Sequence, residues 1–97
     1  MVEITFVTID PRTIGDAIVY GTKELSSYDP ACYDDEDILG EEFVKVTHNG
    51  ETKYIYVYDV LGYNYIPKWN AVVVYGHEEI VIVSLEDWSI VLSQETR

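Results

Sequence analysis

Acidic side chains crowd one short stretch of this 97-residue chain, with six of them in nine positions. Three interpretations follow: a metal site, an imitation of a phosphate backbone, or a solvated charged loop. A calcium loop needs oxygen ligands at its first, third and fifth positions and a glycine at its sixth. Reading frames that begin at either of the first two acids place an apolar residue fifth, so we expect no specific metal site. The acidic residues are Asp34, Asp35, Glu36, Asp37, Glu41 and Glu42.

The rest of the chain is acidic as well. Eighteen Asp and Glu residues against six Lys and Arg give a net charge of −12. This balance argues against a general nucleic-acid-binding protein, which needs a basic surface, and against docking on anionic membranes. Carboxylates at this density repel one another, and a basic partner would neutralise them. The leading hypothesis is a small acidic binding protein that presents its carboxylates like the phosphates of a nucleic acid.

In its specific form, the hypothesis describes a virus-encoded inhibitor of a host nucleic-acid-handling complex, of the anti-restriction or anti-CRISPR type. The partner would be a basic protein surface, such as a nuclease or a DNA-binding complex, with no direct contact to nucleic acid or membrane. Small size, acidity and sparse catalytic motifs favour this form. A single cysteine, Cys32, and a first segment without a basic and apolar leader favour the cytoplasm, which is the host cytosol for a viral protein.

Tyrosine is the second residue type with binding chemistry. Tyr54, Tyr56 and Tyr58 alternate along one predicted strand and so share one face. We favour cross-strand packing in the core, against a helix, for these three side chains. The alternative is an exposed Tyr-rich sheet face that serves a protein interaction or assembly module without mimicry. Tyr33 lies in a predicted loop beside the acidic residues and is a further candidate for partner binding.

Catalytic groupings are sparse. His48 and His77 lie in or beside predicted turns without a neighbouring nucleophile, and Cys32 lies near acidic residues that disfavour its thiolate form. The chain has no glycine-rich phosphate loop and no metalloprotease or esterase motif. We therefore predict no enzyme activity, no catalytic residues and no cofactor.

One pair of segments resembles part of a known family. Residues 68–75 read Lys-Trp-Asn-Ala-Val-Val-Val-Tyr, and residues 79–83 form an apolar run that begins with Glu79. The pair is similar to the closing hairpin of ADP-ribosyltransferase domains, in which an aromatic-Asp-Gly-Val run precedes a Glu-led strand. Asn70-Ala71 replaces the usual Asp-Gly, and the resemblance covers less than a fifth of the chain. It implies a second alternative, a minimal ADP-ribosyltransferase-like enzyme.

The elements that would position these residues are mainly strands. Val, Ile and Thr supply thirty residues, and nine Tyr add to a composition that is typical of sheets. Residues 2–9 alternate apolar and polar side chains, as a half-buried strand does. Asp10-Pro11 then predicts the N-cap and first turn of a helix over residues 11–21, because later apolar residues follow at helical spacing.

Asn49-Gly50 is the clearest local signal. This dipeptide favours a two-residue hairpin turn, because both residues must adopt positive φ. It lies between strand-like runs at 42–48 and 51–59, so His48 should pair with Glu51.

The remaining segments complete the predicted fold. Runs 71–75 and 79–85 are rich in Val and Ile, which predicts a second hairpin of central strands covered on both faces. Residues 62–68 are expected to form a loop or an edge segment, and residues 89–92 a last strand. The sequence therefore predicts one compact domain over 1–97, of the α+β class. It would have five or six largely antiparallel strands and one short N-terminal helix packed on a face of the sheet.

Overall fold

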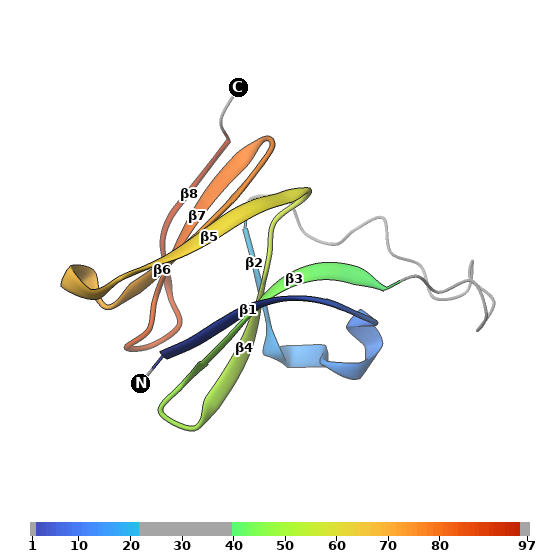
Figure 1. Ribbon diagram of the computed structural model, residues 1–97, viewed down its shortest axis with the longest axis horizontal. Coiled ribbons are helices and arrows are strands. Elements are labelled where there is room, and N and C mark those ends of the chain that lie inside the picture. The colour runs from blue at the N-terminus through green and yellow to red at the C-terminus, as the bar shows by residue number, and fades with distance from the viewer. Residues whose placement is uncertain (1, 22–39, 96–97) are drawn as a thin grey trace.

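The structure is a computed structural model that describes residues 2–21 and 40–95. These residues form two four-stranded sheets, which cross each other in Figure 1. Sheet A has the strand order β1-β3-β4-β2 and sheet B the order β5-β6-β7-β8; neighbouring strands are antiparallel except β2 and β4. The elements are β1 (Val2–Ile9), η1 (Pro11–Thr13), η2 (Gly15–Ala17), β2 (Ile18–Tyr20), β3 (Glu41–His48), β4 (Glu51–Tyr56), β5 (Val60–Ile66), η4 (Pro67–Trp69), β6 (Ala71–Gly76), β7 (Glu79–Ser84) and β8 (Ile90–Glu95).

This architecture shows that the predicted α+β class is wrong. The described residues contain single 3₁₀ turns and no longer helix, and their strands divide between two sheets. The chain passes from sheet A to sheet B after β4, through a turn at Tyr58 and Asp59, where Asp59 adopts a φ of 57°. At this crossing Gly76 lies directly against the backbone carbonyl oxygen of Tyr58, so a side chain at Gly76 would collide with it. The close approach holds the start of sheet B against the end of sheet A.

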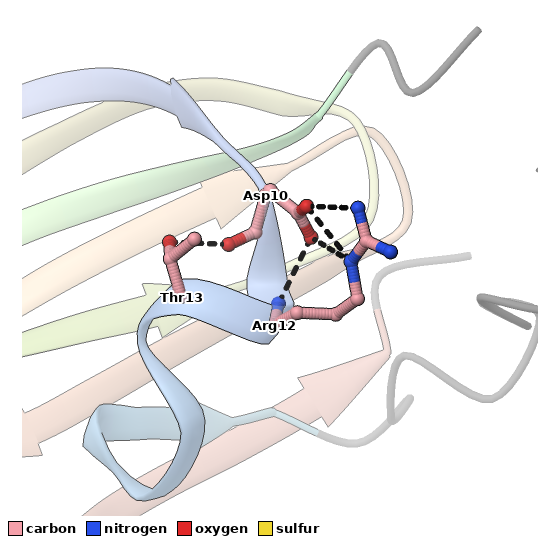
Figure 2. A network of polar contacts seen from close by, with 3 residues as sticks. All are labelled: Asp10, Arg12 and Thr13. Atoms are coloured by element: carbon pink, nitrogen blue, oxygen red, sulfur yellow. Dashed lines mark hydrogen bonds and ion pairs between the residues drawn. The ribbon is translucent and has the colours of Figure 1, made fainter. Parts of the chain in front are cut away.

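The predicted helix over residues 11–21 is replaced by two 3₁₀ turns and the short strand β2. The start signal itself is confirmed, because the Asp10 carboxylate accepts a hydrogen bond from the Arg12 backbone N–H at 3.0 Å (Figure 2). The helix does not continue because Gly15 adopts a φ of 47°, in the left-handed region. The Ile18–Tyr20 segment then pairs with β4 as a parallel edge strand, which suits its β-branched residues.

The Arg12 side chain strengthens this cap. Its guanidinium pairs with the Asp10 carboxylate at 2.6 Å, and the Thr13 hydroxyl donates to the Asp10 carbonyl oxygen at 2.7 Å (Figure 2). One acidic side chain thereby organises the sharp turn that carries the chain from β1 towards the opposite edge of sheet A.

The predicted hairpin at Asn49 and Gly50 is confirmed. Asn49 has a φ of 51° and Gly50 a φ of 79°, and His48 pairs with Glu51 across the turn. The register places alternate residues of β3 and β4 on the inner face of sheet A. Val44, Val46 and Ile55 thus point into the core.

The core lies between the two sheets and draws on both. Each fully buried aliphatic side chain stabilises the fold by roughly 1.5–3 kcal/mol before the entropy cost of ordering. The Trp88 indole N–H, in the turn before β8, donates to the Glu51 carboxylate of β4 at 2.8 Å and adds a polar link between the layers. The buried core cluster consists of Val44, Val46, Ile55 and Val57 from the sheet A side and Val72, Val74, Val81, Val83 and Leu85 from the sheet B side.

The predicted second hairpin is confirmed as β6 and β7, the central strands of sheet B. Their predicted coverage on both faces is wrong, because Tyr75 is exposed and Val73, Ile80 and Ile82 are only half-buried on the face that points away from sheet A. The segment expected to be a loop or an edge is the edge strand β5, followed by η4. The last strand, β8, is longer than predicted and reaches Glu95.

Candidate functional site

An acidic hollow lies where β3 begins and β4 ends. It has a volume of about 340 Å³, and none of the described residues that line it is a Lys or Arg. Three carboxylates and two phenols surround it, which is an arrangement suited to a cationic group. The lining residues are Gly40, Glu41, Glu42, Tyr56, Val57, Tyr58 and Asp59.

Strand pairing fixes the two sides of the acidic hollow. Glu41 stands opposite Ile9 of β1, and Gly40 takes a φ of 74° against the Ile9 backbone, where a Cβ would lie 3.2 Å from the carbonyl carbon. On the other side, the carbonyl oxygen of Tyr56 accepts a hydrogen bond from the Gly21 N–H at 3.2 Å. The backbone on both sides of the hollow is therefore fixed by contacts within sheet A.

The charged form of Glu41 is disfavoured in the acidic hollow. Partial burial raises the pKa of Glu41 above its usual value of 4.5, and the neighbouring Glu42 raises it further. Among the described residues, neither carboxylate forms an ion pair with a Lys or Arg side chain. An incoming cation would relieve this repulsion.

Tyr56 forms the wall of the acidic hollow. Burial raises its pKa to about 12, and the negative charges of Glu41, Tyr58, Glu79 and Glu42 add to the effect in that order. Tyr56 is only 6% exposed. Its phenol therefore stays neutral at physiological pH and can donate a hydrogen bond.

An aromatic cluster supports Tyr56 on the outer face of sheet A. The ring centroid of Phe43 lies 5.6 Å from that of Tyr56 and 6.2 Å from that of Tyr54, and Tyr20 meets Tyr56 edge-on at 6.3 Å. Such contacts stabilise beyond the area they bury. The cluster packs Tyr20 and Phe43 against the ring that forms the wall of the hollow.

The three tyrosines predicted to share a face have different environments. Tyr56 is packed in the interior, although its partners are other rings and not the predicted helix, while Tyr54 is half-buried. Tyr58 lies beyond the end of β4, in the turn to sheet B, and is 58% exposed. Of these side chains, Tyr58 is the one fully available to a partner.

The structure brings part of the predicted acidic set together. Glu41 and Glu42 both line the acidic hollow beside Tyr56 and Tyr58. The other predicted partner-binding residues, Tyr33, Asp34, Asp35, Glu36 and Asp37, lie outside the described residues.

Two residues of this region escaped the sequence interpretation. Tyr20 was assigned to a helix, so its place beside Tyr56 was hidden, and its β-branched neighbours were the available signal. Asp59 lies outside the acidic run that the sequence singles out, and its positive φ at the crossing turn places it on the rim of the hollow.

Within residues 2–21 and 40–95, no group of three His, Cys, Asp or Glu side chains is placed to hold a metal ion. Glu79, which begins the strand that resembles the ADP-ribosyltransferase hairpin, is 1% exposed and does not line the hollow. His77 is exposed and His48 is half-buried at the end of β3.

Comparisons with family models, curated proteins and solved structures found no significant match. In the part of the chain that the structure describes, no helix is long and apolar enough to cross a membrane.

Proposed function

We propose that this protein is a small acidic binding protein that engages a basic protein surface through the acidic hollow. The observation that carries the proposal is the adjacent pair Glu41 and Glu42, neither of which forms an ion pair with a Lys or Arg of the described residues and of which the first has a raised pKa. A guanidinium or ammonium group in the hollow would replace their mutual repulsion with charge-assisted hydrogen bonds.

The two tyrosines suit the same ligand. Tyr58 is 58% exposed and offers a ring face on which an Arg or Lys side chain can rest. Tyr56 is buried and held by its ring neighbours, so its phenol keeps one position before and after binding. A preorganised wall lowers the entropy cost of association.

The charge of the whole chain supports the inhibitory form of the proposal. A net charge of −12 attracts a basic surface over a distance and raises the association rate. The acidic run from Asp34 to Asp37 precedes Gly40 in the sequence by a few residues. If the run and the hollow act together, the protein would compete with a nucleic acid for the basic cleft of a nucleic-acid-handling complex.

A labelled nona-arginine peptide provides the first test. Its affinity for the protein would be measured by fluorescence anisotropy at about 0.05 and 0.3 M salt, because exposed charges are screened within a Debye length. The variant Glu41→Gln/Glu42→Gln should bind the peptide about tenfold more weakly, as expected for the loss of two charge pairs.

The matched control is Glu3→Gln/Glu86→Gln. It removes the same charge at two exposed positions outside the acidic hollow, of which Glu3 pairs with Thr47 at the opposite end of β3 from Glu41. We expect this control to weaken binding less than about twofold, because distant exposed charges are screened. Equal losses in the two variants would show that the peptide responds to net charge and that the hollow is not the binding site.

A further inference from the structure

The outer face of sheet B, which points away from the core, presents apolar side chains to the surface. An antiparallel sheet usually presents polar residues on its solvent side. Here Tyr75 and Leu92 are each 41% exposed, and Val73, Ile80 and Ile82 between them are half-buried. By strand register the face consists of Gly62, Asn64, Ile66, Ala71, Val73, Tyr75, Ile80, Ile82, Ser84, Leu92 and Gln94.

No charged residue occurs on this sheet B outer face, although the chain has eighteen acidic and six basic residues. At the edge strand β5, a tyrosine ring packs over a glycine of this face. The Tyr75 ring lies against Gly62 on the neighbouring strand, where a side chain would collide with it. A flat apolar patch without charges has the composition of the central part of a protein interface.

We propose that the sheet B outer face pairs with the same face of a second copy of this chain. Charge complementarity selects this occupant. A basic partner would find no carboxylate on this face to bind. Two copies of a protein with a net charge of −12 repel each other, and a surface without charges lets them meet without placing like charges face to face. A two-fold axis would place identical apolar rows against each other.

The chain's own residues 22–39 are a poorer occupant. The described chain leaves off at Gly21, which bonds to β4, and resumes at Gly40, which contacts β1, so both ends of the segment are tethered to sheet A. The segment also contains six Asp and Glu residues, whose burial on an apolar face would be costly.

The size of the face sets the expected strength. Four strands of about six residues cover roughly 20 Å by 20 Å, from the usual spacing between strands and rise per residue. This is less than the ~800 Å² per partner of a standard stable interface, so we expect a weak dimer with Kd in the micromolar to millimolar range.

Sedimentation equilibrium from about 10 µM to about 1 mM protein tests the inference over that affinity range. The apparent mass should rise from 11.1 kDa towards twice this value as the concentration increases. Leu92→Glu should stay at the monomer mass, because it places like charges against each other. The matched control is Phe6→Glu on β1 of sheet A, where Phe6 is 42% exposed, and it should associate like the unmodified protein.

A second variant and the salt dependence complete the test. Gln94→Glu adds a carboxylate at an exposed polar position of the same face, so it probes the dimer even if Leu92→Glu fails to fold. Raising the salt should strengthen self-association, because it screens the repulsion between the two acidic copies. Peptide binding at the acidic hollow should weaken with salt, so the two proposals fail independently.

Three results would overturn the inference. The unmodified protein could remain at 11.1 kDa at every concentration, as it would if residues 22–39 or another protein covered the face. Leu92→Glu and Phe6→Glu could reduce association equally. Folded Gln94→Glu could dimerise as well as the unmodified protein.

Discussion

The two sheets contribute similar inner faces to the core and different outer faces to the surface. On the outer face of sheet A aromatic rings pack against one another, and there Phe43 is fully buried and Tyr56 nearly so. Sheet B leaves Tyr75 and Leu92 exposed on a face without charge. Carboxylates gather instead at the end of sheet A, around Glu41.

If both proposals hold, this difference assigns two kinds of recognition to the two sheets. The acidic hollow on sheet A has charge and rigid walls, which favour a cationic ligand and a salt-sensitive complex. The sheet B outer face is apolar and uncharged. These properties favour the same face of a second copy as its partner, in a complex that salt does not weaken. Substitutions on one sheet should leave the other recognition intact.

The largest effect should come from removing a ring of the aromatic cluster. Tyr56→Ala should lower the free energy of unfolding by roughly 3–5 kcal/mol, as large aromatic truncations in cores do. Tyr56 is 6% exposed and packs against Tyr20 and Phe43, so the change leaves a cavity. Urea denaturation of the purified variant measures the loss.

Tyr58→Ala is the matched control, because Tyr58 is 58% exposed and lies outside the strand. We expect its unfolding free energy to stay within about 0.5 kcal/mol of the unmodified protein. Its affinity for nona-arginine should fall, since the exposed ring contributes to the acidic hollow. Comparable destabilisation by both substitutions would mean that the cluster does not support sheet A as described.

The next effect concerns the turn between β3 and β4. Gly50→Val should cost about 1–3 kcal/mol of unfolding free energy, because a β-branched residue at a φ of 79° is strained. A Cβ at Gly50 meets nothing within 4 Å, so the loss would report backbone strain and not a collision. An unchanged melting temperature would argue against the Asn49-Gly50 turn that orders sheet A.

Local patterns in the sequence predict many of the strands. They do not predict how the strands divide between two sheets. The Asn49-Gly50 turn and the Val-rich hairpin after Asn70 are short-range signals, and the structure contains both. Nothing in a local pattern states that the turn at Tyr58 and Asp59 carries the chain into a second sheet, because that choice depends on long-range packing.

The error over residues 11–21 has a local cause. The cap at Asp10 was recognised correctly, but the apolar spacing that followed fits a helix and a half-buried edge strand equally well over so few residues. Gly15 decides the outcome through its positive φ. In the acidic hollow, Glu41 and Glu42 were anticipated from crowding alone, whereas Asp59 needed the sheet crossing to reach it.

A smaller effect should follow from neutralising the acidic run. Converting the four consecutive acids to their amides should weaken nona-arginine binding by about tenfold and flatten its salt dependence, if they act with the hollow. Stability should stay the same or increase, because crowded like charges are removed. Dimerisation through the sheet B outer face should not weaken. The changes are Asp34→Asn, Asp35→Asn, Glu36→Gln and Asp37→Asn.

Peptide binding that is indifferent both to salt and to this fourfold change would contradict charge mimicry. The acidic run would then serve solubility, and the exposed Tyr58 and the sheet B outer face would be the surfaces to study.

The smallest effect should be a pH-dependent gain in stability on replacing Glu41. Its pKa in the folded protein lies above the usual 4.5, so the folded state binds this proton more tightly than the unfolded chain does. Stability therefore falls as the pH rises from 4.5 through the raised pKa, and the full cost is present at neutral pH. Glu41→Gln should raise the melting temperature at pH 7, and this gain should disappear below about pH 4.5, where Glu41 is protonated in both states.

Glu3→Gln, at an exposed position at the far end of the same sheet, should show no such pH-dependent gain. If both variants gained the same melting temperature at every pH, the effect would come from net charge. The acidic end of sheet A would then not differ electrostatically from the rest of the surface.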